Sequence, residues 1–428
     1  MVKIEKVKGM RDYDTDDMIL RRNVVGMVER IFERRGFVPI ETPALEKWDV
    51  LAGKDAGGRE ILEQTFNFLD QGGRRIGLRY DLTVPLVRYV SERSNIGFPF
   101  KRYQYGRVWR YEVTRKGRYR EFYQFDIDVV GASSMAADAE CIATIVDALS
   151  EVGVGKFEVL ISNRKVVEGV LNFLGIKSKR QVNGAMRTID KVEKLSRAQI
   201  YAEFKKYDIV KVQTDEILNA ISRKGKPVEV VRSMLAEFPD NDKVLEGISE
   251  LETLVDYLNA YGVSDRCVFD LSLVRGLGYY TGCVFEARLC KGGDSIAGGG
   301  RYDKVIGSLV SREIPAVGFS LGIERILNIL KGKDYVKRPV CEYFVLYAGD
   351  EMKLSAVRIA EALRAEKKIV ETDLMGRNFS NQMKYANRIG ALKVVIVGQK
   401  EMALGKVVVK DMKKGAETVI EVGRILSV

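Results

Sequence analysis

The sequence predicts an α+β fold divided into more than one domain, and three observations support this prediction. Two segments with alternating polar and apolar residues, 103–112 and 121–130, are typical of strands joined by a loop. Residues 164–258 change to long amphipathic helical patterns rich in Lys and Glu. After residue 338, short apolar runs alternate with helical patterns, which is typical of a small α/β domain with a largely parallel sheet.

The composition is that of a folded protein with a basic surface. Of the 428 residues, 46% are hydrophobic and 30% are charged. No apolar run approaches the roughly 18 residues of a membrane-spanning helix, so we expect a cytoplasmic protein without membrane contact. The net charge of +11 favours a polyanion such as nucleic acid as partner, and a basic surface tuned for solubility is the alternative.

Two residue types restrict the chemistry of the chain. It contains no histidine, which excludes Ser-His-Asp, Cys-His and histidine-rich zinc sites. Its five cysteines include no C-x-x-C pair, so we expect neither a disulfide framework nor a protein-bound structural metal. Catalysis must therefore rest on positioning, on charge stabilisation and on cations held by carboxylates.

The N-terminal region predicts a helix followed by an extended segment. Asp14 or Thr15 can cap the helix, and Gly36 ends it. Its apolar positions recur at helical spacing and are Leu20, Val24, Val28, Ile31 and Phe32. The segment 37–43 contains two prolines, which favours an edge or interface strand over a central strand.

The predicted strand at 121–130 has an apolar face and a polar face. The polar face consists of Phe122, Gln124, Asp126 and Asp128. Such a face suits a ligand pocket, and a solvent-facing sheet surface is the alternative. The loop before this strand, residues 113–120, is strongly basic.

A glycine-rich motif precedes the next predicted strand of this region. Arg275, Tyr279 and Tyr280 stand among three glycines, so the backbone can approach a ligand closely while a guanidinium and two phenols are presented to it. The spacing Gly276-x-Gly278 lacks the third glycine of a dinucleotide-binding fingerprint. The alternative is an ordinary glycine-rich turn that enters a strand.

Several further arginines occur in contexts typical of anion binding. Arg110 lies on a strand before the basic loop, Arg118 lies in that loop, and Arg325 lies in the first turn of a predicted helix. Glu112 shares a strand face with Arg110. These arginines, together with the carboxylates of Asp126 and Asp128, predict a nucleotide that is held on a sheet and not by a Walker loop. The carboxylates could hold Mg²⁺ or meet a cationic substrate.

In their order along the chain, these motifs resemble those of class II aminoacyl-tRNA synthetases, and in particular the histidyl-tRNA synthetases of archaeal and eukaryotic style. Segments similar to the three class motifs are 36–43, 108–124 and 318–325. Segments similar to histidine-specific elements are 78–85, 273–286 and 299–303. The similarity runs from Lys8 to Gly398, so it covers nearly the whole chain.

The resemblance implies an antiparallel six-stranded catalytic sheet with flanking helices, a helical insertion domain and a C-terminal α/β anticodon-binding domain. The expected bounds are 1–163 and 259–330 for the catalytic domain, 164–258 for the insertion, 331–337 for a linker and 338–428 for the anticodon-binding domain. A homodimer is implied, with residues 36–43 at its interface. The implied substrates are ATP with Mg²⁺, L-histidine and tRNA(His).

The resemblance also implies roles for individual residues. Histidine would contact Asp81, Leu82, Thr83, Arg110, Gln124, Asp128, Arg275, Tyr279 and Tyr280. ATP would contact Arg110, Glu112, Phe122 and Arg325, with the Phe122 ring stacked on adenine. The expected catalytic residues are Arg275, Arg110 and Arg325, without a protein-bound metal. The tRNA acceptor end would meet Arg115, Lys116, Arg118 and Arg120.

One alternative function is that of a catalytically silent paralogue, a regulatory subunit of ATP phosphoribosyltransferase in histidine biosynthesis. Such paralogues usually lack the C-terminal domain and have an eroded glycine-rich motif, whereas this chain keeps both. A synthetase for another amino acid of the subclass does not fit Arg275, Tyr279 and Tyr280. Gly278 departs from the family pattern, which usually has an acidic or polar residue there.

Overall fold

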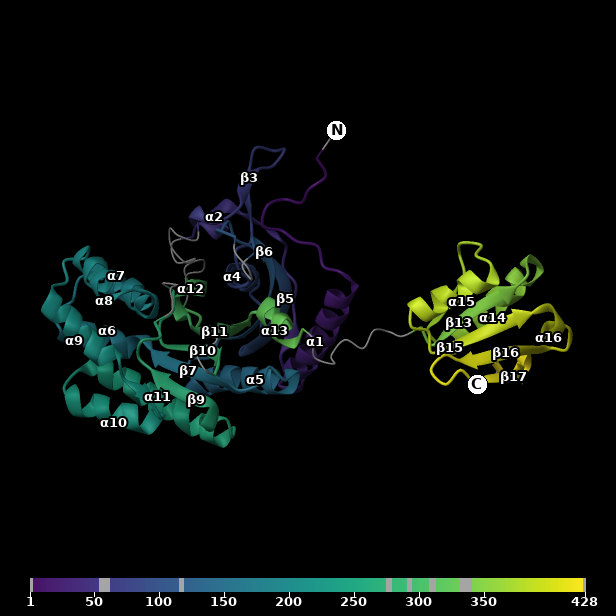
Figure 1. The fold of residues 1–428 in the computed structure, drawn as a ribbon. Coiled ribbons are helices and arrows are strands. Elements are labelled where there is room, and N and C mark those ends of the chain that lie inside the picture. Colours follow the sequence, from purple (N-terminus) through teal and green to yellow (C-terminus); the bar gives the residue numbers. More distant parts are fainter. Residues whose placement is uncertain are drawn as a thin grey trace. The chain divides into compact units, whose positions relative to one another are not determined.

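The chain forms two compact units, Met1–Lys333 and Asp334–Val428, in a computed structural model (Figure 1). The structure describes residues 3–53, 62–114, 119–274, 279–290, 295–307, 313–331 and 341–425. Within these ranges, no helix has the length and apolar character needed to cross a membrane. Each unit has its own sheet, and the units are described separately below.

A nine-stranded sheet organises the first unit, in the order β1-β5-β6-β12-β11-β10-β7-β9-β8. Its strands are β1 (Val38–Pro39), β5 (Phe100–Trp109), β6 (Glu121–Val130), β7 (Phe157–Asn163), β8 (Lys224–Gly225), β9 (Cys267–Asp270), β10 (Cys283–Leu289), β11 (Ser295–Arg301) and β12 (Ala316–Leu321). The six strands from β5 to β7 in this order are antiparallel, as the resemblance implies. Beyond them, β1 pairs with β5 and β9 pairs with β7, both in parallel. Strand β1 is the predicted edge strand.

Strand β5 lies three residues earlier in the sequence than predicted. The alternation predicts a strand over 103–112, but the ladder with β6 ends at the pair Trp109 and Glu121. Beyond it the backbone turns away, because the amide of Tyr111 donates to the carbonyl oxygen of Gln64 (2.7 Å). Arg110 and Glu112 therefore lie just past the strand end.

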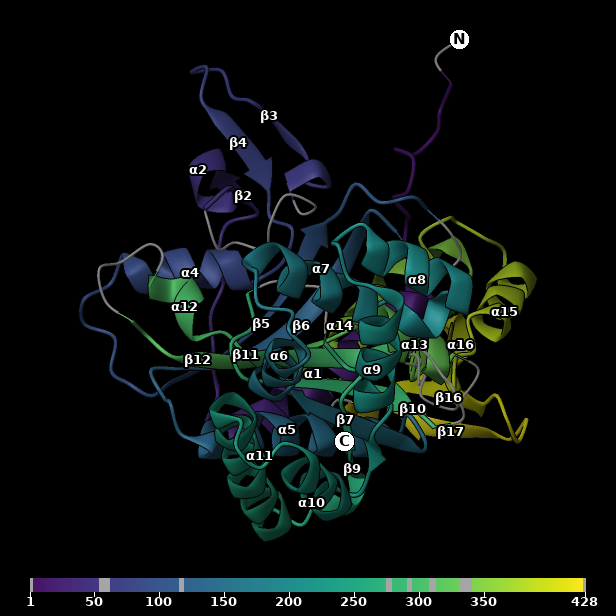
Figure 2. The same cartoon turned by 90° about the vertical axis from the view of Figure 1, so that its left-hand side faces the viewer.

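Long helices cover one face of this sheet (Figures 1 and 2). They are α1 (Thr15–Arg34), α5 (Met135–Val152) and α11 (Asp242–Ala260). Helix α1 is confirmed as predicted, since Asp14 caps it by accepting from the amide of Asp17 and its apolar positions are buried. Gly36 follows it with a φ of 75°, a conformation that favours glycine.

The apolar face of β6 packs against these helices. Phe125 is fully buried, and its ring contacts Phe32 of α1 edge to face with centroids 5.0 Å apart. Cys141 of α5 lies against the same layer, where its thiol reaches the carbonyl oxygen of Val317. The alternating polar side chains of β6 consequently point to the opposite face of the sheet.

Replacing Phe125 by alanine is expected to lower the free energy of unfolding of the first unit by about 3 to 5 kcal/mol, because it leaves a cavity among packed aromatic rings. Urea denaturation followed by circular dichroism measures this change. The control is Phe68→Ala, whose side chain is half exposed on a small sheet and should affect stability far less. Equal losses in both variants would contradict the packing described here.

The helical segment that follows β7 is rich in short helices. They are α6 (Arg164–Phe173), α7 (Lys179–Ile189), η1 (Val192–Lys194), α8 (Arg197–Lys205), α9 (Lys211–Ile221), α10 (Pro227–Glu237) and, after α11, η2 (Ser264–Arg266). Phe204 and Ile217 are fully buried in the core shared by α6 to α9. Strand β8 returns from this segment to the edge of the large sheet, where it pairs with β9.

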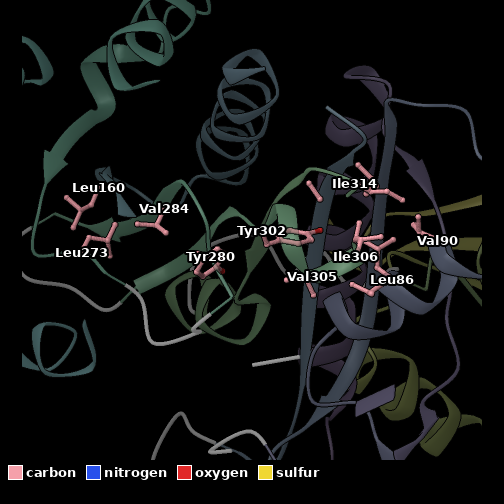
Figure 3. Close-up of a cluster of buried hydrophobic side chains, with 13 residues drawn as sticks. Leu86, Val90, Leu160, Leu273, Tyr280, Val284, Tyr302, Val305, Ile306 and Ile314 are labelled. Atoms are coloured by element: carbon pink, nitrogen blue, oxygen red, sulfur yellow. The ribbon is translucent and has the colours of Figure 1, made fainter. Parts of the chain in front are cut away.

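A small sheet and several short helices complete the described part of the first unit. The sheet has the order β2-β4-β3 and consists of β2 (Leu45–Lys47), β4 (Arg75–Leu78) and β3 (Asn67–Leu69). The helices are α2 (Trp48–Leu51), α4 (Thr83–Ser91), α12 (Asp303–Gly307) and α13 (Ile323–Leu330). Helices α4 and α12 contribute to a buried apolar cluster that also includes Tyr280 and Tyr302 (Figure 3).

The second unit is an α/β domain around a five-stranded sheet in the order β14-β13-β15-β16-β17. Its elements are β13 (Tyr343–Ala348), η3 (Asp350–Met352), α14 (Lys353–Ala365), β14 (Val370–Thr372), α15 (Phe379–Arg388), β15 (Lys393–Gly398), α16 (Gln399–Ala403), β16 (Lys406–Asp411), β17 (Glu417–Glu421) and α17 (Val422–Ile425). The three predicted strands are parallel. The two strands after them form an antiparallel hairpin, so the sheet is less parallel than predicted.

Candidate active site

A cavity of about 510 Å³ opens on the face of the large sheet that α1 and α5 leave uncovered. The polar face of β6 forms part of its wall, with Phe122, Gln124, Asp126 and Asp128 all lining it. Residues of β11, β12 and the first turn of α13 line it as well. The polar strand face is thus a cavity wall and not a solvent-facing sheet surface.

Glycines on β11 and β12 leave space at the floor of this cavity. Gly318 of β12 lies opposite Asp128 of β6, and a Cβ atom at Gly318 would lie 1.9 Å from Oδ1 of Asp128. A Cβ atom at Gly299 of β11 would lie 1.9 Å from the carbonyl oxygen of Gly318. Strand β12 can therefore lie this close to the carboxylate, and β11 this close to β12, only without side chains at these positions.

Asp128 is held from two sides. Its Oδ2 lies 2.5 Å from Nη2 of Arg102, a fully buried side chain on β5, and its Oδ1 accepts a hydrogen bond from the hydroxyl of Tyr302. Burial raises the pKa of Asp128 to about 6, while Arg102 and Tyr302 act in the opposite direction. Burial also raises the pKa of Asp126, to about 7, and the nearby charge of Asp128 adds to this effect.

A row of hydrogen bonds crosses the cavity wall next to this pair. The Nη2 of Arg110 donates to Oε1 of Gln124 (3.4 Å), and Nε2 of Gln124 donates to the hydroxyl of Ser320 (2.7 Å). Ser320 in turn hydrogen-bonds Asp126, which lies opposite it in the ladder between β6 and β12. The row fixes the orientation of the Gln124 amide, with its oxygen toward the arginine.

The start of α4 brings a further carboxylate to the cavity. Oδ1 of Asp81 accepts from the amides of Thr83 (3.1 Å) and Val84 (3.0 Å), which are among the free donors of the first helical turn. Burial raises the pKa of Asp81. Tyr279 and Tyr280 lie beside this turn with ring centroids 4.8 Å apart, and Tyr279 also interacts with the side chain of Thr83.

The other end of the cavity combines arginines with an aromatic ring. The Arg110 guanidinium lies 4.2 Å from the ring centroid of Tyr80 and 5.1 Å from that of Phe122. Glu112 lines the same end. Arg325 comes from the first turn of α13 and donates to the carbonyl oxygen of Ser295, so a second guanidinium stands at a helix N-terminus. This end therefore suits a planar ring and an anion.

Glu324 connects this helix to the N-terminal segment of the chain. Its carboxylate accepts from the hydroxyl of Tyr13 (2.9 Å), from Nη2 of Arg21 (2.9 Å) and from Arg11. The guanidinium of Arg21 lies between the rings of Tyr13 (3.8 Å) and Tyr123 (4.3 Å). The N-terminal segment thus supports both α13 and the cavity wall formed by β6.

The structure brings most of the predicted site residues into this one cavity. Those that line it are Asp81, Thr83, Arg110, Glu112, Phe122, Gln124, Asp128, Tyr279, Tyr280 and Arg325. Leu82 does not; its side chain is fully buried and its carbonyl oxygen accepts from Arg102. Arg120 packs over the Tyr111 ring at 3.9 Å and lies outside the cavity wall.

Some predicted residues lie outside the described residues. They are Arg115, Lys116 and Arg118 of the basic loop, and Arg275 and Gly278 of the glycine-rich motif. In the part of the chain that the structure describes, no group of three or more Cys, Asp and Glu side chains is placed to hold a metal ion.

Residues that belong to this site or support it, but that the predicted set lacks, include Arg102, Tyr302, Ser320 and Glu324. Arg102 and Ser320 owe their positions to the register of β5 and β12 against β6, which no local pattern gives. Tyr302 lies within the segment 299–303, so its motif was a usable signal, although its contact with Asp128 spans 174 positions of sequence. Glu324 directly precedes the predicted Arg325, but its partners lie near the N-terminus.

Comparison with known proteins agrees with this geometry. The family profile described as histidyl-tRNA synthetase matches residues 9–326, and the profile described as anticodon binding domain matches residues 342–428. The histidine–tRNA ligase of Pyrococcus furiosus is 36% identical over 99% of this chain and 98% of its own length. The similarity therefore extends over nearly the full length of both proteins.

Solved structures share the fold. The histidyl-tRNA synthetase from Nostoc superposes with a TM-score of 0.83 at 29% identity and covers 99% of each chain. A Bacillus halodurans protein described as an ATP phosphoribosyltransferase regulatory subunit/histidyl-tRNA synthetase has a TM-score of 0.78 at 24% identity. That match covers 93% of this chain and 99% of the other, and at this identity it indicates the fold alone.

Proposed function

Because the chain belongs to the histidyl-tRNA synthetase family, we propose that its cavity activates L-histidine with ATP for transfer to tRNA(His). One observation carries the proposal. The cavity combines a carboxylate floor around Asp128 at one end with the guanidinium of Arg110 and the ring of Phe122 at the other. An amino acid and a nucleotide can bind there side by side.

The first reaction forms histidyl-adenylate. The histidine carboxylate attacks the α-phosphorus of ATP in line; the new oxygen–phosphorus bond forms as the bond to the bridging oxygen breaks, and pyrophosphate leaves. A carboxylate is already ionised at neutral pH, so the step needs no general base. This chemistry suits a chain without histidine.

Arginines carry the charge of the transition state in this proposal. Arg110, which lines the cavity, and Arg275 would stabilise the α-phosphate, while Arg325 would hold the γ-phosphate. ATP would bring Mg²⁺ on its phosphate oxygens, and Glu112 would supply a carboxylate ligand, an arrangement that suits this metal. Phe122 would stack on the adenine ring.

Asp128 and Tyr280 would select histidine by pairing with its two ring nitrogens. A substrate without either nitrogen would leave a buried polar group of the site unpaired. Sites built on such hydrogen bonds discriminate by roughly 10⁴ to 10⁵, so an editing site is not required. Asp81 and Thr83 would hold the α-ammonium group of histidine. Its positive charge suits a cavity lined by several carboxylates.

The histidyl group would then pass to the 3′-hydroxyl of the terminal adenosine of tRNA(His). We propose the segment 164–258 as a clamp on the acceptor arm and residues 338–428, after a linker at 331–337, as the reader of the anticodon. Arg115, Lys116, Arg118 and Arg120 would meet the acceptor end. The edge strand in segment 37–43 would contribute to a homodimer interface.

Aminoacylation of a tRNA(His) transcript with radioactive histidine tests this function. Histidyl-tRNA should form only when ATP is present, and an unrelated tRNA should remain unlabelled. A catalytically silent regulatory paralogue would give no labelled tRNA. Such a result would contradict the proposal.

A further inference from the structure

Strand β5 places a buried arginine behind the floor of the cavity. Arg102 is the cross-strand neighbour of Asp128, and its side chain has 0% exposure. Its Nη2 lies 2.5 Å from Oδ2 of Asp128 and donates to the carbonyl oxygen of Leu82 (3.4 Å). Arg102 is not among the described residues that line the cavity. It can therefore act on a bound molecule through Asp128.

The surroundings of Arg102 are acidic. It interacts with three buried carboxylates, those of Asp81, Asp126 and Asp128. Burial raises the pKa of each of them, because an ionised group loses its hydration in the interior. The positive charge of Arg102 opposes this effect on all three. Without that charge, we expect Asp128 to be protonated over a larger part of the neutral pH range.

The charge of Asp128 matters for what it can bind. An ionised carboxylate only accepts hydrogen bonds, whereas a protonated one also carries a donor. An acceptor that bears a full charge binds an N–H group about twice as strongly as a neutral one. A ring N–H group of histidine is therefore held best by an ionised Asp128.

We propose that Arg102 is a positioning residue for substrate histidine, which keeps Asp128 ionised and aimed at the imidazole ring. This inference rests on the proposed function, since it takes histidine as the molecule bound in the cavity. Tyr302 supports the same arrangement by donating to Oδ1 of Asp128. The two contacts hold the carboxylate from different elements, a strand and the turn after β11.

The described groups that act on Asp128 come from several elements. They are Arg102 of β5, Asp126 of β6, Asp81 before α4, Tyr302 after β11 and Cys141 of α5. Strand β12 contributes Gly318, which does not titrate. Arg102 is the cation in this set, so its removal should change the titration of Asp128 in one direction.

The test measures the KM for histidine in ATP–pyrophosphate exchange between about pH 6 and 9, a range around the pKa of Asp128. For the wild type, the KM should rise as the pH falls toward 6, because Asp128 then becomes protonated. Arg102→Gln should shift this rise upward by about one pH unit or more. For a shift of one unit, its KM should be about twofold above wild type at pH 7 and about fivefold above it at pH 6, and should approach the wild-type value near pH 9.

The substitution Arg102→Gln should change the KM for histidine far more than it changes kcat at saturating histidine. Arg102→Lys keeps a cation and should give an intermediate profile. Arg34→Gln, which removes an exposed arginine that pairs with Glu151, should follow the wild type. A triazole analogue of histidine, whose ring stays neutral over this range, separates the titration of Asp128 from that of the substrate.

Three outcomes decide the matter. A KM for Arg102→Gln that is raised equally at every pH would mean a merely structural role and overturn the proposal. If this variant does not fold, Tyr302→Phe takes its place, and its profile should shift in the same direction by a smaller amount; an unchanged profile overturns the proposal. Wild-type protein without histidine-dependent exchange would instead contradict the proposed function itself.

Discussion

Replacing Arg110 by alanine is expected to slow adenylate formation by about ten- to 150-fold, because the α-phosphate loses a charge-assisted hydrogen bond of about 1.5 to 3 kcal/mol. The side chain is held in place by the carbonyl oxygen of Tyr80 (3.2 Å) and by Gln124 (3.4 Å), so it is preorganised for this task. Single-turnover measurement of adenylate formation gives the rate directly.

Two further variants show whether the loss belongs to the phosphate contact. Arg110→Lys keeps the charge but not the planar fork, so it should recover only part of the rate. Arg75→Gln removes an arginine that stacks on Trp48 away from the cavity and should leave the rate unchanged. A wild-type rate in Arg110→Ala would rule out the role proposed for Arg110.

Replacing Gly318 by alanine is expected to lower kcat/KM for histidine by about 100-fold or more, since a displaced Asp128 loses its pairing with the substrate ring. The new Cβ atom would lie 1.9 Å from Oδ1 of Asp128 and 2.8 Å from the carbonyl oxygen of Ile127. The carboxylate cannot move freely, because Arg102 and Tyr302 hold it. Steady-state pyrophosphate exchange measures the loss.

Gly26→Ala is the matched control for this substitution. Gly26 lies within α1, and the heavy atom nearest to its added Cβ is an Arg30 nitrogen at 3.6 Å, an ordinary contact. The control should keep wild-type activity and stability. The denaturation midpoint of Gly318→Ala shows whether the variant folds. A folded variant with an unchanged KM for histidine would contradict the described floor of the cavity.

The local patterns of the sequence predicted the elements well where one face of an element is apolar. The alternation of β6 identified its bounds and the polar face that lines the cavity. The cap at Asp14 and the apolar spacing identified α1 in the same way. These patterns succeed because burial on one face imposes a period on the sequence itself.

Contacts between distant parts of the chain could not be predicted in this way. The pairing of Arg102 with Asp128 depends on the register of β5 against β6, and β5 itself lies three residues earlier than the alternation suggested. Glu324 accepts hydrogen bonds from side chains that lie more than 300 positions away in the sequence. The antiparallel hairpin of β16 and β17 was missed because β16 is half-buried along most of its length and β17 is largely exposed, so neither strand shows a clear apolar alternation.

The central claim is that the cavity around Asp128 and Arg110 activates histidine with ATP, and ATP–pyrophosphate exchange tests it most directly. Purified protein should exchange labelled pyrophosphate into ATP when histidine is added. It should do so at most weakly with any other amino acid. Exchange that does not depend on histidine, or no exchange from a folded sample, would contradict the account.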